Sequence, residues 1–234
     1  MNLLDIVFLA VLAAFILAGW YRGFLFTVIS IGAYVVSGGL ALLFMPLLAA
    51  AVRNTDSLYN MMLYYTEGAE KIADVELSRM QIASLSSEEL NRIITDSDLA
   101  FPLDNLIKSN IATEAFADMG VSTLGDYFNQ TIVCVIINIL CFLVLFIGIR
   151  VVLAFILNGI DYAAVLPQLR HSDGLIGAGF GLVRGMLALF LIMMAVPLVL
   201  TVLPFDFIRE TVESSFFGPF FYHLNFLLHL MPGT

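Results

Sequence analysis

The chain has 234 residues, of which 61% are hydrophobic and only 12% are charged. Soluble domains are about 45–50% apolar and about 25% charged, so this composition excludes an ordinary soluble protein and indicates several membrane spans. The net charge of −9 argues against a protein that binds nucleic acid, because such proteins carry basic surfaces.

Two long apolar runs open the chain, at residues 3–21 and 24–52. Each run is long enough to cross a hydrocarbon core of about 30 Å. No basic residue precedes the first run, so we expect a retained span and not a cleaved secretory signal. Arg22 and Gly23 then form a tight turn into the second run, and Pro46 is expected to kink or end that run.

The composition changes abruptly after the second run. Residues 53–130 hold 5 Lys or Arg against 13 Asp or Glu, a net charge of −8. We expect a small extramembrane domain of short amphipathic helices, which is too small to hold more than a thin core of its own. Ser86 with Glu89 predicts a capping box at the start of one helix. Pro102 predicts the start of another helix, which should continue to just before Gly120.

Two further apolar runs predict spans at 131–157 and 174–203, joined by a linker at 158–172. The tail is rich in aromatic residues but is interrupted by proline, histidine and asparagine, so we expect it to lie in the membrane interface. The sequence therefore predicts an all-α integral membrane protein with four transmembrane helices and a helical extramembrane insert between the second and third. The expected domains are the first helix pair, the acidic insert, the second helix pair and the interfacial tail, at 1–52, 53–130, 131–203 and 204–234.

Basic residues near the two short connections indicate the orientation of the chain. Arg22 lies in the first connection and Arg170 in the second, with Arg150 close to the second. The positive-inside rule places these connections in the cytoplasm. The acidic insert and both termini are then expected on the outer face of the membrane.

Charged residues within or beside the predicted spans are the candidate functional residues, because an intramembrane charge is costly and usually has a partner or a function. Arg184 lies 11 residues after Asp173, about 16 Å deeper along a helix. A structural arginine, tied to a carboxylate or a backbone carbonyl, is favoured over a gate or a solute-binding charge. A re-entrant segment with a shallow Arg184 stays open. The full set comprises three aspartates and three arginines whose pairing also stays open: Asp5, Asp161, Asp173, Arg22, Arg150 and Arg184.

Three glycines spaced four residues apart, Gly177, Gly181 and Gly185, form one stripe along a helix. Small residues at this spacing let two membrane helices approach closely, so we interpret the stripe as a packing face and not as a substrate path. Packing within one chain and packing between copies both stay open.

The sequence carries no recognisable catalytic motif: GxSxG, HExxH, the P-loop and the dinucleotide fingerprint are all missing. The three histidines, His171, His223 and His229, share no metal-ligand spacing. The cysteines Cys134 and Cys141 lie too far apart on a helix to form a disulfide. We therefore expect no enzymatic activity, no cofactor and no metal site.

Two elements together resemble the colicin V production protein (CvpA) family of bacterial inner-membrane proteins. The first is an N-terminal span with an aspartate near its start and a glycine-rich turn at its end, formed by Asp5, Gly19, Arg22, Gly23 and Phe24. The second is a D-x-x-x-G-x-x-x-G-x-x-R-G run, formed by Asp173, Gly177, Gly181, Arg184 and Gly185. The resemblance covers the four predicted spans. Residues 53–130 depart from the shorter family members, in which a brief loop joins the second and third spans.

The resemblance implies a protein linked to toxin production and export and to envelope maintenance. It indicates a cellular process and does not specify a molecular mechanism. Our leading hypothesis is a non-enzymatic scaffold or assembly factor whose acidic insert offers a docking surface. The alternative is a small-solute transporter or channel, in which Arg22, Arg150 and Arg184 line a water-accessible path. A third hypothesis is a signalling or protease-regulating partner that acts through residues 53–130. The expected partners are membrane lipid, a second copy of the chain or other envelope proteins, and no nucleic acid.

Overall fold

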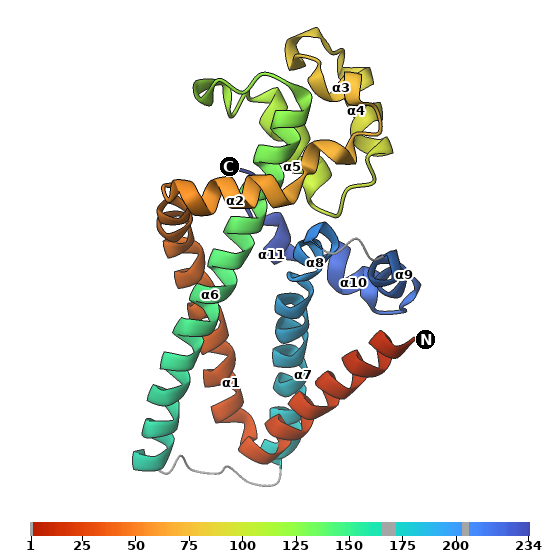
Figure 1. The fold of residues 1–234 in the computed structure, drawn as a ribbon. Helices are drawn as coiled ribbons and strands as arrows, with labels where there is room; N and C mark the ends of the chain where they lie inside the picture. Colours follow the sequence, from red (N-terminus) through yellow and green to blue (C-terminus); the bar gives the residue numbers. More distant parts are fainter. Residues whose placement is uncertain (1, 165–171, 203–205) are drawn as a thin grey trace. The chain divides into compact units, whose positions relative to one another are not determined.

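The computed structural model describes residues 2–164, 172–202 and 206–234, without the side chains of 160–164, 172, 202 and 206. Within this part of the chain the regular elements are helices, and one isolated bridge joins Gln81 to Thr123 (Figure 1). The residues group into two compact units. Unit 1 comprises Met1–Pro46, Cys141–Met194 and Asp206–Asn225. Unit 2 comprises Leu47–Leu140, Ala195–Phe205 and Phe226–Thr234.

Three helices of the described chain are long and apolar enough to cross a membrane. Their elements are α1 (Leu3–Arg53), α6 (Leu124–Ala164) and α7 (Ser172–Met193), the last followed by α8 (Val196–Val202). The two predicted N-terminal spans both lie in α1. The predicted fourth span is interrupted before α8, whose first turn contains Pro197. Proline has no N–H to continue the preceding helix, but it suits the first turn of a new one.

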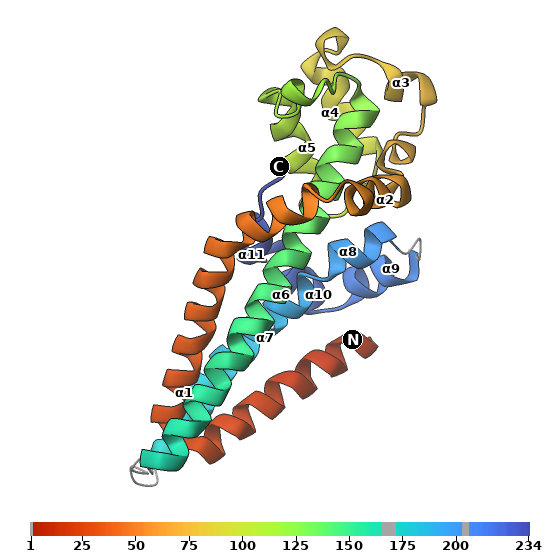
Figure 2. The same ribbon diagram turned by 60° about the vertical axis from the view of Figure 1, so that its left-hand side comes forward.

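The helix α1 reverses direction at Gly23. This residue has φ 78° and ψ 174°, whereas the residues on either side are helical. Figures 1 and 2 both show the chain running to a vertex and returning, so α1 consists of a first arm (3–22) and a second arm (24–53). The tight turn predicted at this point is confirmed. Pro46 does not end the second arm, which continues to Arg53.

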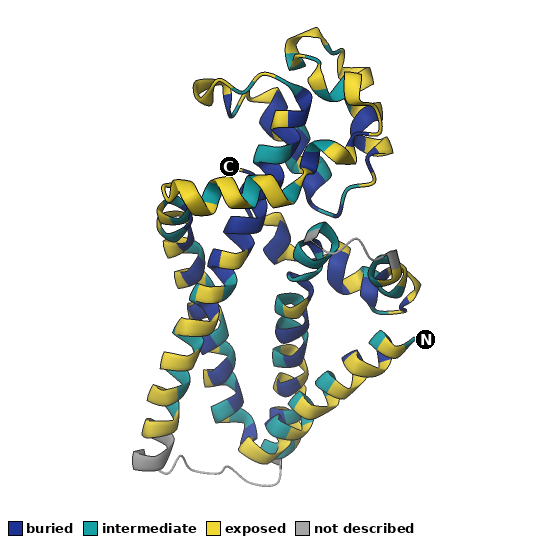
Figure 3. Ribbon diagram, viewed as in Figure 1, coloured by how far each residue is buried: buried dark blue, intermediate teal, exposed yellow. Residues whose placement is uncertain are grey.

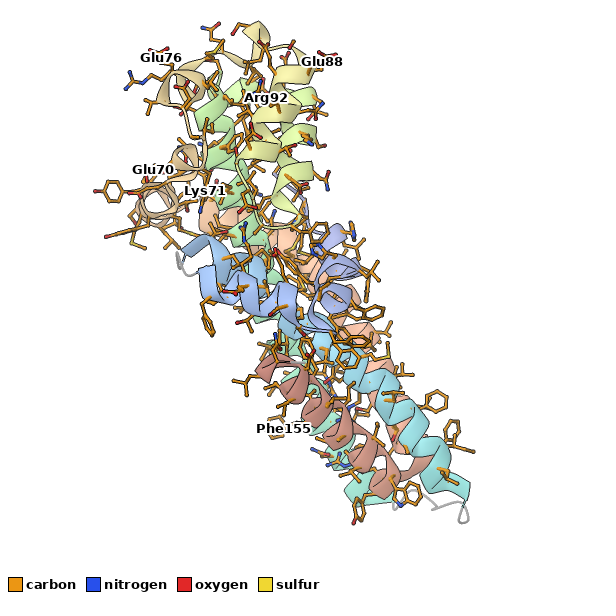
Figure 4. The ribbon with its side chains drawn as sticks, turned by 90° about the vertical axis from the view of Figure 1, so that its right-hand side faces the viewer. Glu70, Lys71, Glu76, Glu88, Arg92 and Phe155 are labelled. Atoms are coloured by element: carbon orange, nitrogen blue, oxygen red, sulfur yellow. The ribbon has the colours of Figure 1, made fainter. Side chains whose placement is uncertain are left out.

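Large apolar side chains of unit 1 are exposed over much of its surface. Figure 3 shows much of the later part of α6 in the colour of exposed residues. The exposed side chains there include Val144, Ile147 and Phe155, and Phe155 is 76% exposed. Figure 4 labels Phe155. Leu43 on α1 and Leu175 on α7 are similarly exposed. Soluble monomers rarely show such extensive apolar surface, whereas helices that face lipid require it. The unit therefore has the surface of a membrane protein.

Unit 2 contains short helices packed around the first third of α6. The short helices are α2 (Asp56–Thr66), α3 (Val75–Arg79), α4 (Ser87–Asp96), α5 (Leu103–Ala112), α8 and α11 (Phe226–His229), with 3₁₀ turns at Gly68–Lys71, Ile82–Ser84 and Ala117–Met119. Tyr127, Phe128 and Ile132 of α6 are fully buried, as are Ile94 of α4 and Ile107 of α5. The acidic segment therefore shares its core with an apolar helix, which makes that core larger than its own sequence predicts.

Two helix-start predictions in the acidic segment are confirmed. Ser86 and Glu89 form the predicted capping box, and these hydrogen bonds hold the pKa of Glu89 below its usual value. Helix α5 begins directly after Pro102 but ends at Ala112, well before Gly120. The chain turns out of the helix at Glu114, which has φ 49° in the left-handed region.

The aromatic tail forms short helices instead of one continuous helix. Unit 1 contains α9 (Asp206–Ser214) and α10 (Gly218–His223). The ring of Phe221 in α10 packs edge-on against Phe8 and Phe190, with centroids 5.4 and 5.2 Å away. Asn225 Nδ2 donates a hydrogen bond to the Phe190 carbonyl at 2.8 Å. Part of the tail is therefore held inside unit 1, and its position relative to the membrane interface stays a prediction.

Candidate functional site

The kink in α1 is stabilised by Asp173 of α7. Because Gly23 is not helical, the backbone N–H of Phe24 is the first donor of the second arm and has no acceptor in its own helix. Asp173 Oδ1 accepts a hydrogen bond from this N–H at 2.8 Å. A carboxylate at a helix N-terminus also interacts favourably with the helix dipole. The aspartate of the second motif therefore caps a helix that starts within the first motif.

The other motif aspartate, Asp5, binds the tail. Its Oδ1 accepts hydrogen bonds from the Ser215 hydroxyl at 2.5 Å and from the Phe217 backbone N–H at 3.1 Å, and its Oδ2 accepts one from the Asn2 N–H at 2.8 Å. The residue is completely buried. Buried carboxylates need several donors to compensate for lost solvation, and Asp5 has them. Asp5 therefore joins the start of α1 to the turn between α9 and α10.

The glycine stripe of α7 packs against the first arm of α1. A Cβ atom added to Gly177 would overlap the Gly19 carbonyl oxygen, and one added to Gly181 would overlap the Phe15 carbonyl oxygen. At Gly185 an added Cβ would lie 3.1 Å from a methyl carbon of Leu12, which is a tighter contact than usual. The two helices thus meet backbone to backbone, as small-residue faces permit. The partner of the stripe lies within the same chain.

Arg150 of α6 and Arg184 of α7 meet at Ser30 of the second arm. Arg150 Nη2 donates to the Ser30 hydroxyl at 3.0 Å, and Arg184 Nη1 donates to the same oxygen at 3.2 Å. The charges of Arg150 and Arg22 both act electrostatically on Arg184. Arg150 and Arg184 therefore meet at one acceptor, and together with Arg22, whose charge acts on Arg184, they form the arginine cluster. Among the described side chains, no ion pair joins any of them to a carboxylate.

Aromatic rings cover the faces of the arginine guanidinium groups. The Arg150 Cζ atom lies 4.7 Å from the centroid of Tyr34, and the Arg184 Cζ atom lies 4.8 Å from that of Phe15. Arg22, which is exposed, lies over Phe26 at 4.7 Å. These cation–π contacts orient the guanidinium planes while their N–H edges stay available for hydrogen bonds. Two of those nitrogens, Arg150 Nη1 and Arg184 Nε, are buried and have no hydrogen-bond partner in the described chain.

The six charged residues predicted for the site therefore fall into separate groups. Arg22, Arg150 and Arg184 come together, whereas Asp5 and Asp173 bind backbone groups elsewhere in unit 1. Asp161 lies in α6, and its side chain is outside the described residues. The expectation that the aspartates pair with the arginines therefore does not describe Asp5 or Asp173.

The side chains that contact the arginines were not predicted from the sequence. Ser30 and Tyr34 lie four residues apart on one face of the second arm, and Phe15 lies on the first arm. The available signal was a hydroxyl and a phenol at helical spacing inside an otherwise apolar run. That signal alone does not identify which basic residues of distant helices would reach them.

The polar contacts of unit 2 are structural. Asn110 of α5 donates to the Thr131 hydroxyl and to the Gly233 carbonyl, both at 2.9 Å. Asn138 of α6 donates to the carbonyls of Pro232 and Thr234 at 2.9 and 3.1 Å. Across the part of the chain that the structure describes, no three His, Cys, Asp or Glu side chains are arranged to hold a metal ion.

The sequence model of one protein family matches the chain. Residues 4–73 and 111–225 match the sequence model of the family described as "Colicin V production protein". The match includes both motif aspartates, the glycine stripe and all three arginines of the cluster, and it omits 74–110, which lies in the acidic segment. No curated protein and no solved structure matches the chain.

Proposed function

Because the chain belongs to the colicin V production protein family, we propose that it is a non-enzymatic membrane scaffold that supports toxin production and export and envelope maintenance. It is a multi-pass membrane protein with long apolar helices. The proposal depends on one observation, which is where the motif residues make their contacts. The glycine stripe and both motif aspartates contact other segments of unit 1, so they hold the membrane part together.

The proposed scaffold crosses the membrane four times. The vertex at Gly23 supports this number, because it lets the two arms of α1 serve as separate crossings that begin and end on opposite faces. The other two crossings are formed by α6 and by α7 with α8. In this topology the short connections lie in the cytoplasm, and the acidic segment and both termini lie on the outer face, as the positive-inside rule favours.

Acidic side chains of unit 2 form the proposed docking surface. Glu70, Glu76 and Glu88 come from three different short elements and are exposed, and Figure 4 shows them projecting away from the ribbon. A surface with excess negative charge attracts and orients partners that carry basic patches. We therefore propose that the scaffold binds an envelope protein with a basic surface.

Neutralising these carboxylates tests the docking surface. The full-length chain with Glu70→Gln, Glu76→Gln and Glu88→Gln should accumulate in the membrane like the natural chain, because the three side chains are exposed and lie outside the spans. Toxin secretion by a strain that lacks its own family member should fall severalfold, and fewer proteins should be cross-linked to the chain, because removing charge from a complementary surface slows association.

The matched control is Lys71→Gln with Arg92→Gln, which neutralises basic side chains of the same unit (Figure 4). It should secrete toxin and form cross-links as well as the natural chain. Equal toxin secretion by the acidic variant and the control would overturn the docking proposal.

The arginine cluster favours one second candidate, a path for a small anionic solute. In that case Arg22, Arg150 and Arg184 line a water-accessible route through unit 1. Single cysteines introduced at 180–188 distinguish the two candidates. Modification by a membrane-impermeant thiol reagent favours the path, and protection of every position favours the packed scaffold.

A further inference from the structure

The cationic cluster of unit 1 has no internal neutralising group among the described side chains. Arg150 and Arg184 both donate to the hydroxyl of Ser30, which is uncharged, and the phenol of Tyr34 also interacts with Arg184. Arg22 adds a third positive charge that acts on Arg184. Charges of one sign in a membrane protein repel each other and are expensive to desolvate unless an opposite charge approaches them.

The two aspartates of unit 1 whose side chains are described bind other groups. Asp5 and Asp173 accept hydrogen bonds from the Phe217 and Phe24 backbone N–H groups.

The geometry of the cluster suits a tetrahedral oxyanion. Arg150 and Arg184 approach Ser30 from two helices, and each is stacked on an aromatic ring that fixes its plane. Arg150 Nη1 and Arg184 Nε are buried donors without an acceptor in the described chain. Guanidinium groups bind phosphate oxygens through paired N–H donors, and a hydroxyl that accepts two hydrogen bonds still has its own proton to donate.

We propose that Arg150, Arg184 and Ser30 form a binding site for a phosphate group, with Arg22 at the entrance of the site. The unpartnered N–H groups of the two arginines donate to the phosphate oxygens. The bound phosphate neutralises part of the cluster and satisfies the buried donors, which removes the cost of leaving them without an acceptor.

The position of the cluster allows two sources of phosphate. Ser30 lies seven residues beyond Gly23, about 10 Å along the second arm, and the hydrocarbon core is about 30 Å thick. Arg22 is adjacent to the vertex and exposed. The phosphate of a lipid headgroup reaches such a site from the interface, and a free phosphate ion reaches it from the aqueous side.

Two measurements on the purified full-length chain separate these sources. In the first, inorganic phosphate is titrated against the chain in a zwitterionic detergent, and its binding is followed by a rise in melting temperature. In the second, the chain is placed in nanodiscs of mixed phosphatidylglycerol and phosphatidylcholine, and native mass spectrometry counts the retained lipids. Binding of inorganic phosphate assigns the site to the free ion, and preferential retention of phosphatidylglycerol assigns it to a headgroup.

Three variants identify the site. Arg150→Gln and Arg184→Gln should each weaken the observed binding about tenfold or more, because each removes charge-assisted hydrogen bonds. Arg184→Lys should bind better than Arg184→Gln but worse than the natural chain, because it keeps the charge and loses the planar fork. Ser30→Ala should weaken binding to a smaller extent. This variant tests the site if an arginine variant does not fold.

Arg92→Gln is the control, because Arg92 is an exposed residue of unit 2 whose contact is an ion pair with Asp96. It should bind phosphate or lipid like the natural chain. The proposal is overturned if the natural chain binds neither inorganic phosphate nor phosphatidylglycerol in preference to phosphatidylcholine. It is also overturned if the folded Ser30 and Arg184 variants bind as tightly as the control.

Discussion

At the scale of single residues, the backbone conformation of Gly23 accounts for the contact that Asp173 makes. The backbone of Gly23 has φ 78° and ψ 174°, a region that residues with a Cβ atom rarely adopt. An added Cβ would also lie 2.6 Å from Asp173 Oδ2. The same conformation leaves the Phe24 N–H without an acceptor in its own helix, and Asp173 accepts a hydrogen bond from it. One glycine therefore creates both the turn and the donor that the distant aspartate binds.

Gly23→Ala should destabilise the chain by about 2–4 kcal/mol, because backbone strain costs about 1–3 kcal/mol and the contact with Asp173 adds to it. The matched control is Gly32→Ala on the second arm, where an added Cβ meets no atom within 4 Å. Thermal unfolding in detergent measures both variants. Equal melting temperatures for the two variants would contradict this account of the turn.

The residue scale also shows why charge pairing was hard to predict. The sequence places three aspartates and three arginines in or near apolar runs, and opposite charges usually pair there. Two aspartates instead bind backbone N–H groups that exist because helices start at Phe24 and near Phe217. A buried carboxylate is stabilised as well by several such donors as by one arginine.

At the scale of secondary-structure elements, the approach of α7 to the first arm of α1 depends on glycines at the contact. The added-atom contacts at Gly177 and Gly181 are with backbone carbonyl oxygens, which cannot move without displacing a helix. Gly179 lies on the same helix, and an added Cβ there meets no atom within 4 Å. The stripe is therefore a packing surface and the intervening glycine is not part of it.

Gly181→Leu should lower the amount of folded protein in the membrane and destabilise it by about 3 kcal/mol or more, because overpacking against a rigid neighbour forces the helices apart. Gly179→Leu makes a matched control and should leave folding unchanged. Membrane yield and size-exclusion profiles in detergent measure both. A Gly181→Leu variant that folds and assembles like the control would refute the packing assignment.

The lengths of the elements were predicted less well than their positions. The sequence predicts the turn at Gly23 and the capping box at Ser86, and both are confirmed. It predicts a fourth span at 174–203, and the candidate span Asp173–Thr201 consists of two helices, α7 and α8. Pro197 lies in the first turn of α8, and the interruption lies just before it. Local signals locate a helix start, but the place where a helix stops also depends on its neighbours.

At the scale of the whole molecule, the chain divides into two units that do not follow the boundaries of its composition. Residues 131–140 of α6 were assigned to a span, yet they belong to unit 2, where Ile132, Ile137 and Ile139 are buried. Hydropathy measures how apolar a segment is, and it cannot distinguish lipid from a protein core as the surrounding medium.

Replacing residues 74–110, which the family match omits, by a short flexible linker should leave unit 1 folded. The contacts of the glycine stripe, Asp5, Asp173 and the arginine cluster all lie within unit 1. Amide hydrogen exchange of residues 172–193 should therefore be unchanged, whereas residues 124–140 should exchange faster, because α4 and α5 no longer cover them.

The natural chain under the same conditions is the reference for this exchange experiment. Faster exchange in 172–193 would show that unit 1 depends on the acidic segment. If the shortened chain supported toxin secretion at the natural level, the acidic segment would have no part in the proposed function.

The sequence by itself determined the membrane class, the all-helical fold, the turn at Gly23, the packing character of the glycine stripe and the family resemblance. These features depend on local composition and on spacing along one helix, which a single chain displays directly. Only the tertiary structure decided that Asp5 and Asp173 bind backbone groups and that Arg150 and Arg184 meet at Ser30. Those contacts join residues up to 212 positions apart, and the choice among possible partners depends on how the helices cross.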